Sequence, residues 1–296
     1  MQCGGTIGSF GCSEMVSEGR CGPSFPAMDK VIVIAQLWGY NYFHAIIEGL
    51  PRLISALDSL PPADRANDWL VHSMMEEPLA AQVAEFAGVK GMVRGYIRAS
   101  RLLVPAPTPC GGSVGGRAML RLRSYIRMRL PRALLHSQRT LVVFKRSGAR
   151  ALANHADVLL AAGRLWAAGP VVEHDGGGTF LEQMARLAAA GALIGPHGAG
   201  MSSAVAMRPG AAVAEVLPEQ GPNRLNVCFA ALAHTLGLRY FALRAPGFDS
   251  EGLGVVHIPD LEALPLWPGP AGRPVTKCTT DEDSDSLESL SGGCVH

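Results

Sequence analysis

The segment Ala192–Ser203, ALIGPHGAGMSS, is the first stretch whose residue types suggest chemistry. A short apolar run leads into a turn that holds His197, and small residues able to begin a helix follow. The amides of Gly198, Ala199 and Gly200 would point outward at a helix N-terminus, where glycine lets an oxyanion approach the backbone. The turn therefore predicts a site for a negatively charged group, although a tight strand-to-helix connection with a packed histidine gives the same pattern.

Cationic side chains follow a second apolar run, TLVVF, and strengthen this interpretation. Lys145, Arg146 and Arg150 come soon after Phe144, and parallel strands all end at one edge of a sheet. Guanidinium groups that converge with free amides form a diphosphate site. A solvated surface loop is the alternative, but two such features on one sheet edge favour a ligand.

A third group of polar residues lies on the predicted helix NYFHAIIEGLPRL. Its apolar stripe would pack on a sheet and leaves an opposite, polar stripe of four residues: Asn41, His44, Glu48 and Arg52. His44 and Glu48 are four residues apart, so each can orient the other for proton transfer. An ordinary solvated helix face has the same pattern.

Three other motifs are weaker. GGSVG fits a hydrolase pattern around Ser113, but no strand leads into it. DED and DSD fit a metal-binding pattern, but they belong to an acidic tail that we expect to be disordered. GAGMSS, with Glu215 at the end of the next strand, resembles a dinucleotide fingerprint, so an NAD(P)-dependent oxidoreductase is the main alternative function.

Positioning these residues requires a parallel α/β sheet, and the rest of the sequence predicts one. Strand-like and helix-like runs alternate at the spacing of right-handed crossovers. One helix is expected to begin at Tyr42, a second to end at Gly88 and a third to span Arg117–Leu130. Two more are expected to begin after a cap at Asn154 and after a Thr179–Glu182 capping box. The predicted strands are Val31–Leu37, WLVH, RLLVPAP, TLVVF, VVEH, ALIG, AAVAEVL and RYFAL.

Composition narrows the function classes. The 296 residues are 48% hydrophobic with a net charge of +1, which describes a globular protein and argues against nucleic-acid binding through bulk charge. No apolar run approaches the roughly 18 residues of a membrane helix, and the first thirty residues lack a signal-peptide pattern. Seven cysteines include no C-x-x-C pair, so we expect no metal site.

Taken together, four segments resemble glycosyltransferase family 61, which includes plant-type xylosyltransferases and O-linked N-acetylglucosamine transferases. They are NYFHAIIEGLPRL, FKRSGARALAN, FLEQMARLAAAGALIGPHGAG and AAVAEVLP, and the likeness runs from about Val31 to Leu243. The resemblance implies an α/β, GT-B-like fold with two Rossmann-like domains whose parallel sheets face a cleft. It also implies an inverting enzyme that moves a xylose-, N-acetylglucosamine- or arabinose-type sugar from a UDP-sugar to a hydroxyl of a glycan or protein.

The resemblance also divides the chain. It implies an acceptor-side domain over residues 30–138 and a nucleotide-sugar domain over 139–264, between a polar segment (1–29) and a Pro/Gly/acidic tail (265–296). Family members reside in the Golgi or endoplasmic reticulum lumen, so that location is expected, although the chain shows no targeting segment or anchor. A non-catalytic member of the family is a further alternative.

The same resemblance assigns roles to individual residues. His44 and Glu48 would lie near the acceptor, and we expect Glu48 to be the catalytic base, with His44 the second candidate. Glu215 would approach the nucleoside. No metal or other cofactor is expected, because cations and amides would hold the donor diphosphate: Arg146, Arg150, His197, Gly198, Ala199 and Gly200.

Overall fold

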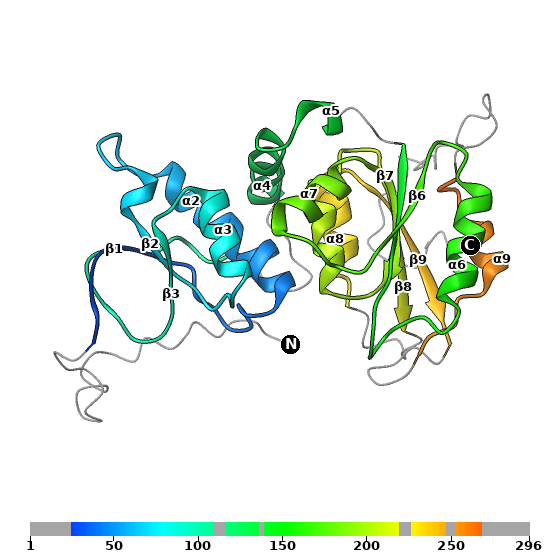
Figure 1. Ribbon diagram of the computed structural model, residues 1–296, viewed down its shortest axis with the longest axis horizontal. Coiled ribbons are helices and arrows are strands. Elements are labelled where there is room, and N and C mark those ends of the chain that lie inside the picture. Colours follow the sequence, from blue (N-terminus) through cyan, green and yellow to red (C-terminus); the bar gives the residue numbers. More distant parts are fainter. Residues whose placement is uncertain (1–24, 109–115, 136–138, 219–225, 247–252, 268–296) are drawn as a thin grey trace, which may run out of the picture.

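The computed structural model describes residues 25–108, 116–135, 139–218, 226–246 and 253–267. The strands form two separate parallel sheets, which define an N-terminal and a C-terminal lobe (Figure 1). The predicted α/β class with two Rossmann-like parallel sheets is therefore confirmed. The motif around Ser113 and the acidic tail lie outside the described residues.

The N-terminal lobe contains a four-stranded parallel sheet in the order β3-β2-β1-β4. Its strands are β1 (Ala27–Val33), β2 (Leu70–His72), β3 (Gly91–Val93) and β4 (Arg98–Leu103). Its helical elements are η1 (His44–Gly49), α2 (Leu50–Asp58), η2 (Ala66–Asp68) and α3 (Leu79–Ala87). Because the strand order reverses at β1, the chain segments that follow β1 and β4 leave the sheet side by side.

The C-terminal lobe contains a five-stranded parallel sheet in the order β6-β5-β7-β8-β9. Its strands are β5 (Thr140–Phe144), β6 (Val171–His174), β7 (Ala190–Pro196), β8 (Ala212–Pro218) and β9 (Arg239–Ala245). Its helical elements are α6 (His155–Leu165), α7 (Phe180–Ala188), η3 (Ala199–Ala206), α8 (Cys228–Leu236) and α9 (Ile258–Glu262). Here the order reverses between β5 and β7, which is where a doubly wound sheet opens a crevice for ligands.

Helices cover both faces of the second sheet. α7 and α8 lie on its inner face, toward the N-terminal lobe, and α6 and α9 cover the outer face (Figure 1). α4 (Gly116–Met128), followed by α5 (Arg132–Leu135), lies between the lobes and contacts α2, α8 and η3. A single apolar cluster therefore runs from the first lobe through Met119 and Leu122 of α4 into the second.

Most predicted elements are present, with differences that have physical reasons. β1 ends at Val33 instead of Leu37, because the amides of Ile34 and Ala35 both bind the carbonyl of His72 and the chain leaves the sheet there. The strand predicted as RLLVPAP ends at Leu103, before two prolines that cannot donate to a ladder. The elements η2, β3, α5 and α9 were not predicted. No helix among the described residues has the length and apolarity needed to cross a bilayer.

Asn154 precedes α6 as predicted, but its side chain forms no capping hydrogen bond to that helix. It instead donates to the carbonyl of Val256 at 2.7 Å and accepts from the amide of Val256 at 3.0 Å. The prediction that Asn154 caps the helix is therefore wrong, because a distant backbone segment binds both the oxygen and the nitrogen of its side-chain amide.

The predicted domain boundaries stay predictions.

The capping box at the start of α7 is confirmed. Thr179 Oγ1 accepts the amide of Glu182 at 3.3 Å, and Glu182 Oε2 accepts the amide of Thr179 at 2.7 Å. Gln82 of α3 adds a third bond, because its Oε1 accepts the amide of Phe180 at 2.7 Å. The start of α7 is thus fixed by its own sequence and by the other lobe.

Replacing Thr179 with Ala removes the acceptor for the Glu182 amide and should lower the free energy of unfolding by about 1 kcal/mol. Thr179→Ser keeps the hydroxyl and should retain most of the stability. Urea denaturation followed by circular dichroism measures both. Equal losses in the two variants would contradict the capping role.

Candidate active site

Arg146 reaches the turn after β7 from the end of β5. Its Nη1 donates to the carbonyl of His197 at 3.4 Å, and its Nε donates to the carbonyl of Ala149 at 2.6 Å. Burial lowers the pKa of Arg146, and the charge of the neighbouring Arg150 lowers it further. The guanidinium of Arg146 is therefore held against the glycine turn, where the strand order reverses, and the positive charge of Arg150 acts on it there.

Arg150 and Lys145 occupy different positions around this site. Arg150 has a φ of 63°, a left-handed conformation that non-glycine residues seldom adopt and that often marks a functional turn. Lys145 is turned toward β6, where its Nζ contacts Glu173 Oε1 at 3.1 Å. Of the three predicted cations, Arg146 and Arg150 thus lie together, and Lys145 is committed to an ion pair.

Two glycines of the turn have neighbours that leave no space for a side chain. A Cβ added at Gly198 would overlap the guanidinium of Arg146, and one added at Gly200 would overlap the ring of Phe144. The φ of Gly198 is 172°, which is ordinary extended backbone. Gly200 is therefore required by close packing against the ring at the end of β5, whereas a methyl at Gly198 would have to displace only the far end of the Arg146 side chain.

His197 is held by a fully buried carboxylate. Its Nδ1 binds Oε1 of Glu215, whose other oxygen accepts the hydroxyl of Tyr240 at 2.5 Å. Glu215 has no exposed surface, so it would act on a bound nucleotide only through His197 or Tyr240. The hydroxyl pKa of Tyr240 is raised by burial and by the adjacent Glu215, so the phenol stays protonated and donates. This arrangement fixes the ring of His197, and Nε2 is the ring nitrogen that Glu215 does not bind.

A second histidine–carboxylate pair occupies the equivalent edge of the first sheet. His44 Nδ1 lies 2.8 Å from Glu48 Oε2, and Gln36 Nε2 donates to the same oxygen at 2.8 Å. The hydroxyl of Thr108 donates to the main-chain carbonyl of Glu48 at 2.9 Å. Gln36 follows β1 and Thr108 follows β4, so Glu48 lies where the strand order of this sheet reverses.

Arg52 stabilises this edge of the sheet through hydrogen bonds to main-chain carbonyls. It is buried, and its guanidinium donates to the carbonyls of Ile34 at 3.1 Å and Val33 at 3.3 Å, both at the end of β1. A third donation reaches the carbonyl of Pro105 at 3.5 Å, in the segment after β4. Burial lowers the pKa of Arg52, which nevertheless stays a cation. Arg52 thus ties the two chain segments of the reversal together.

The helix that carries His44 and Glu48 is a π-helix over His44–Gly49. Such wide turns are rare and are frequently found at functional sites. Glu48 is only 3% exposed, whereas the His44 side chain is 21% exposed. The histidine is therefore the member of the pair that faces solvent, and the carboxylate lies behind it.

Aromatic rings join the two histidine–carboxylate pairs across the lobes. The ring of Phe43 lies edge-to-face against His44 at 5.2 Å and against Phe229 of α8 at 5.5 Å. Phe229 in turn lies 5.4 Å from the ring of His197. Tyr42 adds a hydrogen bond of 3.2 Å to Ser203 of η3. The two candidate groups therefore belong to one site formed by both lobes.

The thiol of Cys228 is influenced by the carboxylates of both histidine–carboxylate pairs. Burial raises the pKa of its thiol to about 12, and the negative charges of Glu215 and, to a smaller extent, Glu48 contribute to the shift. One buried thiol thus lies near a carboxylate from each lobe. At neutral pH this thiol is protonated and unreactive.

The structure brings the predicted site residues together in two groups that meet, although it does not test their roles. Sequence reasoning missed the residues that hold them: Gln36, Tyr42, Phe43, Thr108, Phe229 and Tyr240. Gln36 carried a usable signal, since it is the first polar side chain after an apolar strand. Tyr240 carried one too, because β8–β9 pairing sets it diagonally across from Glu215 on one sheet face.

The family model of Glycosyltransferase 61 matches residues 42–214. The matched region includes His44, Glu48, Arg146 and the whole glycine turn, and it ends one residue before Glu215. No curated protein sequence matches the chain significantly.

Replacing Gly198 with Ala should separate ligand binding from folding. The added methyl displaces the mobile end of Arg146, so we expect stability to change by less than about 0.5 kcal/mol. Affinity for inorganic pyrophosphate should fall about tenfold, the loss expected for one charge-assisted hydrogen bond. Calorimetric titration and thermal unfolding measure the two effects.

Gly200→Ala is the matched comparison. Its methyl meets the packed ring of Phe144, so this variant should lose about 1–3 kcal/mol of stability, part of which the added change Phe144→Leu should restore. If Gly198→Ala binds pyrophosphate as the parent does, Arg146 does not take part in anion binding.

Proposed function

The chain belongs to glycosyltransferase family 61, and from that premise we propose that it is an inverting enzyme that transfers a sugar from a UDP-sugar. The acceptor is a hydroxyl group of a glycan or protein, and the sugar is of the xylose, N-acetylglucosamine or arabinose type. The observation that carries the proposal is the guanidinium of Arg146 against the His197–Gly198 backbone, at the strand reversal of the second sheet.

Departure of the nucleotide leaves a negative charge on the diphosphate, and the enzyme must stabilise it. Arg146 supplies a positive charge held against the turn, the charge of Arg150 acts on the same guanidinium, and the backbone amides of Gly198–Gly200 lie next to Arg146. Groups positioned before the reaction stabilise a developing charge without a reorganisation cost. We therefore assign the leaving-group role to these residues, with no requirement for a divalent metal.

His197 is positioned to assist. Its Nδ1–H is committed to Glu215, which fixes the tautomer and ring plane, and Tyr240 satisfies the remaining carboxylate oxygen. The free edge of the imidazole lies in the same turn as the diphosphate amides. Glu215 is then a positioning residue that acts on the donor through His197.

For the base, the geometry favours the reverse of the order expected from sequence. Glu48 is almost fully buried and accepts hydrogen bonds from His44 and Gln36, whereas His44 faces outward. With Nδ1–H donated to the carboxylate, Nε2 of His44 is an acceptor for the hydroxyl proton of the acceptor. We propose His44 as the base and Glu48 as the carboxylate that orients it.

Family membership supports two further proposals and weakens an alternative. The lumen of the Golgi or endoplasmic reticulum is the proposed location, with nucleotide sugars and glycans or glycoproteins as partners and no nucleic acid. The NAD(P)-dependent oxidoreductase alternative required Glu215 to bind a ribose, but both oxygens of that carboxylate bind protein groups and none of it is exposed.

Donor binding can be tested with a thermal-shift panel of UDP, GDP, CMP, NAD and UDP-sugars, each with and without EDTA. UDP and one UDP-sugar should raise the midpoint of unfolding, NAD should not, and EDTA should change neither result. Arg146→Gln should weaken UDP binding by about 10²-fold, as expected for the loss of a hydrogen bond to a charged group. Exposed Arg164, which pairs with Glu262 on the outer face, provides the control Arg164→Gln. Stabilisation by NAD in place of UDP would overturn the proposal.

The base is tested by the pH dependence of kcat/KM with the UDP-sugar found in the panel. His44→Asn should lower kcat by about 10²–10⁴-fold and remove the acidic limb of the profile. Glu48→Gln should lower kcat by a smaller factor and keep that limb. UDP affinity should stay unchanged in both variants. Loss of the limb in Glu48→Gln, with an active His44→Asn enzyme, would assign the base to Glu48.

A further inference from the structure

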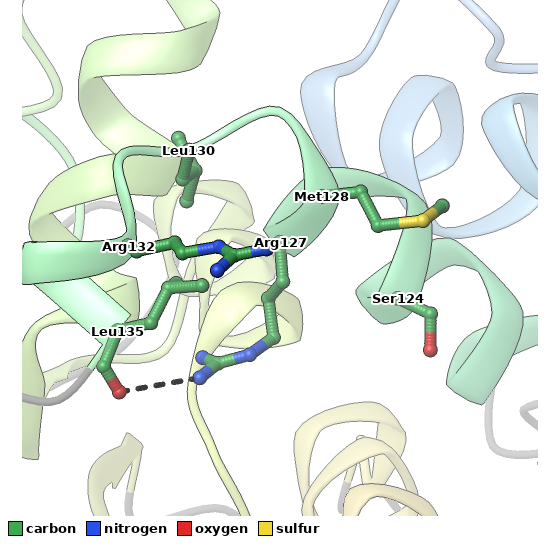
Figure 2. A pocket seen from close by; sticks show the side chains of 6 residues that line it. All are labelled: Ser124, Arg127, Met128, Leu130, Arg132 and Leu135. Carbon is green, nitrogen blue, oxygen red and sulfur yellow. Dashed lines mark hydrogen bonds between the residues drawn. The ribbon is translucent and has the colours of Figure 1, made fainter.

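A hollow of about 430 Å³ lies between α4 and α5, away from the site described above. Six residues line it: Ser124, Arg127, Met128, Leu130, Arg132 and Leu135 (Figure 2). This volume is within the range of sites that hold small organic molecules. Arg127 Nη1 also donates at 3.1 Å to the carbonyl of Ala206, at the C-terminal end of η3. Because η3 begins at the glycine turn, its length of about 14 Å separates the hollow from the proposed donor site.

The charged side chains that line the hollow are both positive. Residues 86–156 include no Asp or Glu and contain fourteen Lys and Arg residues. Ion pairs with acids from elsewhere in the chain neutralise some of them, including Arg94, Arg101 and Arg121. Within the described residues, neither Arg127 nor Arg132 pairs with an acid. Two positive charges therefore remain in the hollow without a counterion from that part of the protein.

The two arginines differ in how they are held. Arg127 is fixed, because besides the Ala206 bond its Nη2 donates to the carbonyl of Leu135 at 3.4 Å. Burial lowers its pKa, and the charge of nearby Arg208 lowers it further. In the part of the chain described, Arg132 forms no hydrogen bond or ion pair. Both side chains reach into the hollow (Figure 2), so a fixed and an uncommitted guanidinium face the same space.

Apart from Ser124, the remaining walls are apolar. Leu130 is 7% exposed, Leu135 is partly buried and Met128 is 73% exposed. A sugar ring that carries an acidic group presents both kinds of surface, because its C–H face is apolar and its carboxylate or sulfate is anionic. A bilayer would require a flat or protruding surface, whereas this lining is concave.

We propose that the hollow between α4 and α5 binds an anionic sugar residue, either a uronic acid or a sulfated sugar, within a glycan chain. Arg127 and Arg132 bind the acidic group with charge-assisted hydrogen bonds. Leu130, Leu135 and Met128 contact the ring. The site is separate from the donor turn, so it does not depend on the proposed transfer reaction.

The test is calorimetric titration of the full chain at low salt. The ligands are an oligogalacturonate, a sulfated disaccharide, free galacturonic acid, sodium sulfate and a neutral oligosaccharide of equal length. The oligogalacturonate or the sulfated disaccharide should bind, and the neutral one should not. Arg132→Gln should weaken acidic-sugar binding about tenfold. Because Arg132 forms no bond within the described residues, thermal unfolding should not change.

Arg117→Gln is the matched control, since it removes the same charge from an exposed position on α4 outside the hollow. It should leave acidic-sugar affinity within twofold of the parent value. UDP binding should be unchanged in both variants, so failure here is distinguishable from failure of the proposed donor site. If free galacturonic acid binds as tightly as the oligogalacturonate, the hollow recognises a single sugar residue, which supports the proposal.

Four results would overturn the proposal. The first is failure of the acidic sugars to bind. The second is a loss of acidic-sugar affinity in Arg117→Gln as large as that in Arg132→Gln, which would indicate diffuse attraction by the basic surface. Sodium sulfate that binds as tightly as the acidic sugars would remove the role of the ring. Arg132-dependent binding to anionic phospholipid vesicles alone would assign the hollow to a membrane surface instead.

Discussion

The contact between the Arg146 guanidinium and the carbonyl of His197 depends on the topology of the second sheet, and the rest of the site follows from it. Because the strand order reverses between β5 and β7, the segments after these two strands leave the sheet in opposite directions along its edge. Arg146 from one segment therefore meets the glycine backbone of the other at this reversal. Any side chain at Gly198 would separate the two. Charge and main-chain dipoles are therefore concentrated at one point of the fold.

The two lobes place a histidine–carboxylate pair at equivalent positions, and each carboxylate has further donors. Glu48 accepts from His44 and Gln36, and Glu215 accepts from His197 and Tyr240. A buried carboxylate is costly unless it is hydrogen-bonded, so these donors are a condition for burial. The result is two imidazole rings whose orientation is fixed from behind. Phe43 and Phe229 then set the spacing between the rings across the lobes.

The sequence predicted the residues of this site better than the neighbouring residues that hold them in position. Arg146, the glycine turn and the His44–Glu48 pair could be found because each follows an apolar run or falls on one helix stripe. Gln36 also follows an apolar run, whereas the roles of Thr108 and Tyr240 could be found only once the strand order was known, because their partners are distant in sequence. The same limit explains Asn154, whose position suggested a cap but whose partner, Val256, is 102 residues away. Local patterns determined the elements, and topology determined the contacts between them.

The apolar cluster that runs through α4 has a consequence for how the two halves move and fold. It joins Ile32 and Leu50 of the first lobe to Leu193 and Leu232 of the second without a polar boundary. Separating the lobes would expose this surface to water at roughly 25 cal/mol for each Å². Wide hinge opening is therefore disfavoured. Either half expressed by itself would expose this apolar surface and would be prone to aggregation.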